Sequence, residues 1–157
     1  MATAKLKNMH ARQFGNGPYG NVTTLAFALA TGANGSAINS DQATGLAIGD
    51  VVDLGPLPEG MRLDDASLFV TVGMTATITG SLGFKYEDGV DVAAVPQDAA
   101  YFGTGINLAA AGRVRATGSK LVTLPKPARL ILTTAVAANA KISTIGVVVT
   151  GELLGDR

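Results

Sequence analysis

Apolar and polar residues alternate along most of this chain, which is the period expected of half-buried β-strands rather than of helices. The clearest stretch is residues 75–86, in which alternate positions place apolar side chains on one face. That face carries Ile78, Leu82, Phe84 and Tyr86. Similar runs between turn-forming residues predict strands at residues 22–30, 47–54, 66–72, 75–86, 90–95, 113–116, 121–124, 129–135 and 141–153.

Glycine and proline mark the expected breaks between these strands. The segment Gly55-Pro56-Leu57-Pro58-Glu59-Gly60 is expected to end the strand before it, because proline cannot donate to a strand ladder. Asn34-Gly35 and residues 87–89 are typical of turns. Residues 101–112 are ambiguous, and their glycines favour a loop or a weak strand over a helix.

Roughly eight to ten short strands separated by regular turn signals predict an all-β sandwich or barrel over residues 22–157. The 14 valines and 16 threonines support this prediction, because β-branched residues suit pleated surfaces. Residues 1–21 are interpreted as an extended N-terminal arm, since residues 13–21 are too rich in Gly, Asn and Pro for a helix or a central strand. A flexible tail is the alternative, and residues 2–9 are compatible with a weak helical turn.

The composition excludes several classes of function. The 157 residues include no cysteine, so disulfides, zinc–thiolate sites and thiol nucleophiles are excluded. Twelve basic and twelve acidic residues give a net charge of zero, which argues against long-range attraction to nucleic acids or anionic membranes. We therefore expect neither a nucleic-acid partner nor a membrane partner.

The net charge of zero is the total of three unequal segments. Residues 1–40 carry a charge of +3, residues 41–98 carry −8 and residues 99–157 carry +5. One interpretation is that folding interleaves these segments and neutralises them within the molecule. The other is that patches of opposite sign meet across subunit contacts, where they would set register and specificity more than affinity.

A glycine pattern and a single histidine are two candidates for functional motifs in the N-terminal residues. Gly15, Gly17 and Gly20 form a G-x-G-x-x-G, but a dinucleotide site requires a strand before this run and a helix after it. Here Pro18 removes an amide donor and a strand-like sequence follows, so a glycine-rich turn is the better interpretation. His10 is the only imidazole, and we expect it to be solvated or packed rather than catalytic.

Two clusters of acidic residues also suggest chemistry. Glu87, Asp88 and Asp91 resemble part of a calcium loop but lack the spacing and the closing glutamate of an EF-hand. The side chains of Asp64 and Asp65 would point to opposite faces of a strand, which is poor geometry for a catalytic pair. We expect turn and surface roles for both clusters, and we expect no metal, no cofactor and no catalysis.

Four segments resemble the head decoration (cement) proteins of tailed bacteriophages. Residues 49–60 and 63–70 resemble a strand, a proline–glycine turn and a second strand that crosses the sandwich. Residues 129–134 and 142–151 resemble the closing hairpin of these proteins. The resemblance covers about two-thirds of the chain and implies a single jelly-roll-like β-sandwich.

The resemblance also implies a function without catalysis. The protein would bind the outer surface of an assembled capsid and stabilise it, with the major capsid protein as partner and with itself as a homodimer or homotrimer. It would be made in the host cytoplasm, which the lack of cysteine suits, and would reside on the capsid exterior of the virion. The arm would contact the shell or a sister subunit through Lys5, Lys7, Arg12, Phe14 and Tyr19.

A ligand-binding module and a hydrolase are the two alternative functions. A ligand- or glycan-binding β-sandwich module of a tail or fibre would require an exposed aromatic platform. The chain has no tryptophan and offers only Tyr19, Tyr86 and Tyr101. A hydrolase would require two buried carboxyl groups separated by about 5–9 Å in a cleft.

Overall fold

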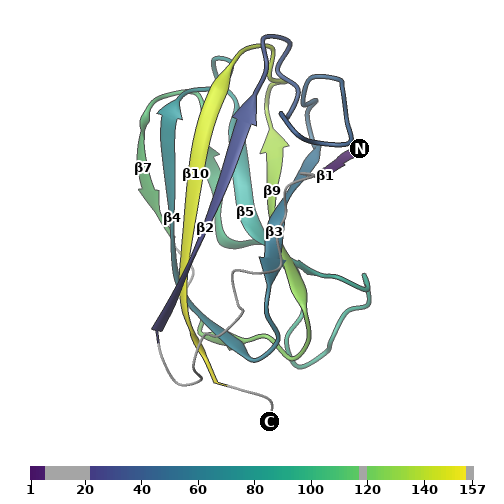
Figure 1. Ribbon diagram of the computed structural model, residues 1–157, viewed down its shortest axis with the longest axis vertical. Coiled ribbons are helices and arrows are strands. Elements are labelled where there is room, and N and C mark those ends of the chain that lie inside the picture. Colours follow the sequence, from purple (N-terminus) through teal and green to yellow (C-terminus); the bar gives the residue numbers. More distant parts are fainter. Residues whose placement is uncertain (6–21, 117–119, 155–157) are drawn as a thin grey trace.

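The computed structural model describes residues 1–5, 22–116 and 120–154, and in these residues the secondary structure consists of β-strands in two facing sheets (Figure 1). The first sheet has the order β1 (Thr3–Lys5), β3 (Val51–Leu57), β9 (Ala128–Ala135), β5 (Thr79–Tyr86) and β6 (Asp98–Asn107). The second has the order β2 (Val22–Thr31), β10 (Ser143–Leu153), β4 (Met61–Val72) and β7 (Gly112–Arg115), and β8 (Val122–Thr123) also pairs with β4. The predicted all-β, jelly-roll-like sandwich is confirmed.

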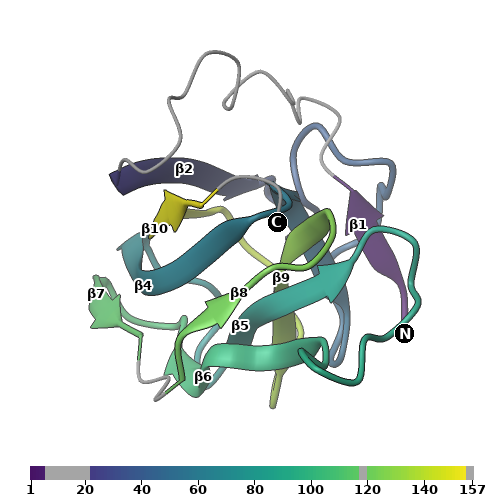
Figure 2. The same cartoon turned by 90° about the horizontal axis from the view of Figure 1, so that it is seen from below.

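The alternation in the sequence places one face of each sheet in a shared core, and Figure 2 shows the two layers seen along the strands. In β2, for example, Leu25, Phe27 and Leu29 are buried while Thr24, Ala26 and Ala28 between and beside them are not. Fully burying an aliphatic or aromatic side chain stabilises a fold by about 1.5–3 kcal/mol. The largest fully buried side chains come from both sheets and the loops: Tyr86, Phe84, Leu25, Leu29, Leu46, Leu57, Met61, Leu63, Leu68, Met74, Ile78 and Leu82.

The break predicted at Gly55-Pro56 is wrong, because β3 continues through both residues to Leu57. The register between β3 and β9 shifts between Asp53 and Gly55, which marks a bulge in the ladder. Proline is tolerated next to such irregularities, where the regular pattern of amide donation is already interrupted. Gly55 is also required here, since a Cβ at this position would lie 2.6 Å from a ring carbon of Phe27.

Other local predictions are wrong, since residues 47–50 and 75–78, predicted as strand, lie outside β3 and β5. Thr3–Lys5 pair in parallel with Val51–Asp53, so the helical turn considered for residues 2–9 is wrong over β1, and Ala4 is part of the core. Residues 90–95 contain a single bridge between Val92 and Val95 rather than a strand. The weak strand weighed for residues 101–112 is confirmed as far as Asn107, because residues 98–107 form the edge strand β6, whose pairing with β5 shifts register twice.

The predicted closing hairpin is wrong. β9 pairs with β3 and β5 in the first sheet, whereas β10 pairs with β2 and β4 in the second. Both strands are apolar at alternate positions and separated by a short turn, which is the usual signature of a hairpin. Here the turn at residues 136–142 passes from one sheet to the other. Each strand therefore has neighbours on both sides in its own sheet, and neither pairs with the other.

None of the described segments is a helix long and apolar enough to cross a membrane. Nor do three or more acidic or histidine side chains gather around a possible metal position within the described ranges.

Candidate contact surfaces

The structure describes one of the five residues predicted to contact a partner. Lys5 is exposed at the end of β1, where its backbone N–H donates to the Asp41 carboxylate at 2.9 Å and its carbonyl accepts from the Asp41 N–H at 3.0 Å. Lys7, Arg12, Phe14 and Tyr19 lie outside the described residues, as do His10 and the glycine run of residues 15–20. The arm is thus anchored to the first sheet through its first five residues.

The two ends of the sandwich differ in charge. The loops at residues 32–50, 73–78, 108–111 and 136–142 lie together at the upper end in Figure 1, and we call them the apolar loop end. They contain only three charged residues: Asp41, Asp50 and Lys141. The Asp50 carboxylate is buried and accepts backbone N–H groups from Ala2 and Ala47. The loops themselves therefore carry few charges, and the N-terminus and Lys5 lie beside them, next to Asp50 and Asp41.

The ion pairs of the described residues gather in the other half of the molecule. Arg129 pairs with Asp53 at 3.1 Å, and Lys126 pairs with Asp88 at 2.8 Å. The adjacent acids Asp64 and Asp65 each pair with their own arginine, Arg62 and Arg115. Three of these bases, Arg115, Lys126 and Arg129, belong to residues 99–157, which carry a net charge of +5. Their aspartate partners belong to residues 41–98, which carry −8. Folding therefore pairs these charges within one molecule, as the first interpretation of the charge distribution expected.

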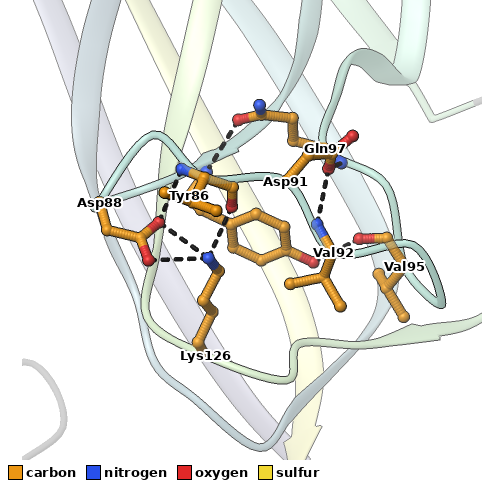
Figure 3. A network of polar contacts seen from close by, with 8 residues as sticks. Tyr86, Asp88, Asp91, Val92, Val95, Gln97 and Lys126 are labelled. Atoms are coloured by element: carbon orange, nitrogen blue, oxygen red, sulfur yellow. Dashed lines mark hydrogen bonds and ion pairs between the residues drawn. The ribbon is translucent and has the colours of Figure 1, made fainter.

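The loop that resembled part of a calcium site is held by its own acidic side chains (Figure 3). The Lys126 ammonium lies 2.8 Å from both oxygens of Asp88 and 4.6 Å from the ring centroid of Tyr86. Its hydrogen bond lowers the pKa of the Asp88 carboxyl. Asp91 accepts the backbone N–H groups of Val92 and Gln97, and the Tyr86 hydroxyl donates to the Val95 carbonyl. These contacts fix the backbone of residues 87–97.

Replacing Lys126 with methionine is expected to loosen this loop without unfolding the sandwich. The substitution keeps most of the apolar stem over Tyr86. It removes the ammonium group, whose hydrogen bonds are accepted by the Asp88 carboxylate and the Val90 carbonyl. Exposed ion pairs contribute little to global stability, whereas local opening depends on just such contacts. Amide hydrogen exchange should accelerate at residues 87–97 and stay unchanged in β9 and β10. Equal exchange rates in this loop of the wild type and the variant would contradict the role of Lys126 in holding the loop.

A pocket of about 560 Å³ lies beside this loop, between residues 94–97, β6 and β8. Tyr101 lines it, and the Tyr101 ring makes edge contacts with Phe84 and Phe102. The Tyr101 hydroxyl donates to the Lys120 carbonyl, and burial raises the pKa of this phenol. The volume suits a small ligand. Tyr86 is buried, so among the described residues the ligand-binding alternative would rest on Tyr101 and this pocket.

Buried hydrogen bonds hold the apolar loop end together. The Asn139 side chain, 2% exposed, donates to the Lys141 carbonyl at 2.9 Å and to the Thr31 hydroxyl at 3.1 Å. Its oxygen accepts the backbone N–H of Thr75 at 3.1 Å, and its own backbone N–H donates to the Leu46 carbonyl at 2.8 Å. One side chain thus connects three loops that are far apart in the sequence.

The same end contains exposed apolar and strained residues. Ile38, Ile48, Val72, Val136 and Ile142 are exposed in its loops or at the strand ends beside them. The described non-glycine residues with positive φ also belong to these loops: Asn39 (61°), Thr77 (69°) and Val136 (71°). This conformation costs about 1–2 kcal/mol for residues other than glycine and is unusual for a β-branched side chain. Such strain is concentrated at functional sites in proteins.

Comparisons with known proteins identify the fold. No protein-family model matches the sequence, and no curated protein matches it either. A chain in the capsid of Ralstonia phage GP4 superposes with a TM-score of 0.69 at 22% identity, over 99% of this chain and 100% of that chain. The chain has the fold of a phage capsid chain. A second chain, from the capsid of cyanophage Pam1, gives a TM-score of 0.58 at 19% identity over 88% and 89% of the two chains.

The phage capsid fold confirms, at the level of the fold, the resemblance inferred from the sequence. The sequence did not reveal the apolar loop end, however. Ile48 and Ile142 fell within the strands predicted at residues 47–54 and 141–153, so the available signal was Val136 alone, in the turn between two predicted strands. Asn139 gave no signal, because an asparagine between alanines is typical of any turn.

Proposed function

We propose that this protein is a structural component of a tailed-phage virion that binds the outer surface of the assembled capsid and stabilises it. Its partner is the major capsid protein, and it acts as a homodimer or homotrimer without catalysis. The supporting observation is the match to the Ralstonia phage GP4 chain, which covers 99% of one chain and all of the other. A likeness over both full lengths fits a chain whose sandwich is the functional unit.

The described polar groups support a binding role over a catalytic one. Asp53, Asp64, Asp65 and Asp88 are engaged in ion pairs, and Asp50 and Asp91 accept backbone N–H groups. A rigid sandwich also loses little conformational freedom when it docks. Many such contacts, repeated over a capsid lattice, become collectively strong even where each is weak.

The N-terminal arm is proposed as the contact with the shell or with a sister subunit. Its proposed contact residues are Lys5, at the end of β1, and four residues that follow it in the sequence: Lys7, Arg12, Phe14 and Tyr19. Deleting residues 1–20 would also remove Ala4 from the core. Substitution of the four side chains tests the arm while β1 stays in place.

The test uses capsids that lack this protein and the purified full chain. Wild-type protein should co-sediment with the capsids up to a saturating ratio and raise the temperature at which they disrupt. The variant with Lys7, Arg12, Phe14 and Tyr19 all changed to alanine should lower occupancy at least about tenfold, whereas Lys85→Ala with Lys120→Ala should not. Absence of saturable binding by the wild-type chain would refute the proposed function, and full binding by the arm variant would refute the arm assignment.

A further inference from the structure

Polar contacts hold the walls of the pocket between residues 94–97, β6 and β8. The Tyr86 hydroxyl donates to a carbonyl of residues 94–97, and the Asp91 carboxylate accepts a backbone N–H from the same segment (Figure 3). The Tyr101 hydroxyl of β6 lies within hydrogen-bonding distance of the Lys120 carbonyl, which joins β6 to the segment before β8. The pocket is therefore formed before any ligand enters it. A site that is already ordered loses less conformational entropy on binding.

Part of the pocket surface is apolar. It comes from the aliphatic side chains of residues 94–96 and Val122 and from the half-buried ring of Tyr101. Edge contacts with Phe84 and Phe102, at 5.5 and 4.8 Å between ring centroids, fix the Tyr101 ring. Small-ligand sites typically combine such an apolar surface with a few polar groups that orient the ligand.

Three polar side chains in the pocket keep hydrogen-bonding groups that no described residue uses. The Gln97 oxygen accepts the Tyr86 N–H at 3.3 Å, and the N–H groups of the Gln97 amide have no acceptor among the described residues. One oxygen of Asp98 accepts the Ala100 N–H at 2.8 Å. Neither the Asp98 carboxylate nor the Lys120 ammonium forms an ion pair with another described residue. The pocket thus offers one charged hydrogen-bond acceptor and two kinds of donor.

We infer that this pocket binds a neutral sugar residue of a glycan. Each sugar hydroxyl both donates and accepts, so one hydroxyl donates to Asp98 while another accepts from Gln97 or Lys120. The Tyr101 ring and the aliphatic wall suit the C–H face of a sugar ring. Because Asp98 and Lys120 have opposite charges, an ionic ligand would meet one attractive and one repulsive group. This ligand site goes beyond the proposed capsid-binding role and does not depend on it.

Amide-resolved NMR of the full chain, titrated with the methyl glycosides of glucose, galactose, mannose and N-acetylglucosamine, tests the inference. At least one glycoside should shift the amide resonances of residues 94–104 saturably and leave those of β2 and β10 unchanged. Gln97→Glu keeps the oxygen that accepts the Tyr86 N–H but removes the amide donor. Asp98→Asn keeps an oxygen for the Ala100 N–H but removes the negative charge. Each variant should weaken glycoside binding at least about tenfold.

Gln42→Glu and Asp41→Asn are the matched controls, because they make the same changes in a loop at the other end of the sandwich and should leave binding unchanged. A well-dispersed spectrum of each variant is the check of folding. The inference is overturned if no glycoside gives saturable shifts, if both pocket variants bind as tightly as wild type, or if inorganic phosphate binds this pocket more tightly than any glycoside. Glycoside binding by a chain that fails to bind capsids would refute the proposed function and leave this inference standing.

Discussion

Replacement of Arg129 by methionine is expected to lower the free energy of unfolding by about 3–5 kcal/mol at neutral pH. The Arg129 Nε lies 3.1 Å from both carboxylate oxygens of Asp53, which is 3% exposed. Burial raises the pKa of the Asp53 carboxyl, and Arg129 opposes that rise by charge and by hydrogen bonding. Without the guanidinium, a buried carboxylate would remain in the core without its main counter-charge.

The effect of Arg129→Met should depend on pH with a definite sign. Because the folded-state pKa of Asp53 lies above its unfolded value, the folded state binds the proton more tightly, and the cost of its ionisation is fully present only above the folded pKa. Loss of Arg129 raises that pKa further. The variant is therefore expected to be less stable than wild type at neutral pH, and this difference in the free energy of unfolding should shrink as the pH falls through the folded-state pKa of Asp53 in the variant.

Urea unfolding at neutral pH and at successively more acidic pH measures both effects. Arg115→Met is the matched control, since Arg115 also pairs with an aspartate but its side chain is 74% exposed. Exposed pairs contribute about 0–1 kcal/mol, so this variant should change little at any pH. Equal losses in the two variants, or a loss at Arg129 that does not shrink with acid, would contradict the role given to the Asp53 pair.

Asn139→Ala is expected to lower the free energy of unfolding by about 1–3 kcal/mol, the cost of a polar group left without a partner, because the Thr75 N–H loses its acceptor while Thr31 and Lys141 remain bonded to each other. The substitution removes the acceptor of the Thr75 N–H and the donor to the Thr31 hydroxyl and the Lys141 carbonyl. Because Thr75 lies in the loop at residues 73–78 and Thr31 at the end of β2, the loss should also separate the loop at residues 136–142 from these two segments.

Chemical unfolding together with hydrogen exchange checks this prediction. Amide exchange at Thr75 should accelerate in Asn139→Ala, while β4 and β10 keep most of their protection. Asn34→Ala is the control, because the Asn34 side chain makes its hydrogen bonds to Ser36 and Ala43 at the surface of the same end. A change no larger than that of Asn34→Ala would show that Asn139 does not hold these loops.

The strands with a clean alternation were predictable from the sequence, and the exceptions have local causes. β2 and β5 follow the period of two over their whole length, so their inward faces were evident. The strand β3 was predicted too short because a bulge between Asp53 and Gly55 lets it continue through Pro56, and a glycine in a strand is compatible with either a bulge or a break. The prediction of a hairpin between β9 and β10 was wrong because the length of a turn does not show whether the two strands that it connects lie in the same sheet.

The apolar loop end was not predictable because it exists only in three dimensions. Its four loops come from residues 32–50, 73–78, 108–111 and 136–142, and residues 47–50, 75–78 and 141–142 within them were predicted as strand. The left-handed backbone of Val136 and the burial of Asn139 are set by packing between loops rather than by neighbouring residues. Charge was more informative, since the pairs Arg129–Asp53 and Lys126–Asp88 follow the opposite signs of their segments.

The most direct test is a cryo-EM reconstruction of capsids before and after addition of the purified chain. The proposed function predicts new density on the outer surface, at repeated positions, into which the two-sheet sandwich of Figure 1 fits. No added density, or density confined to the capsid interior or to the tail, would contradict a decorating role.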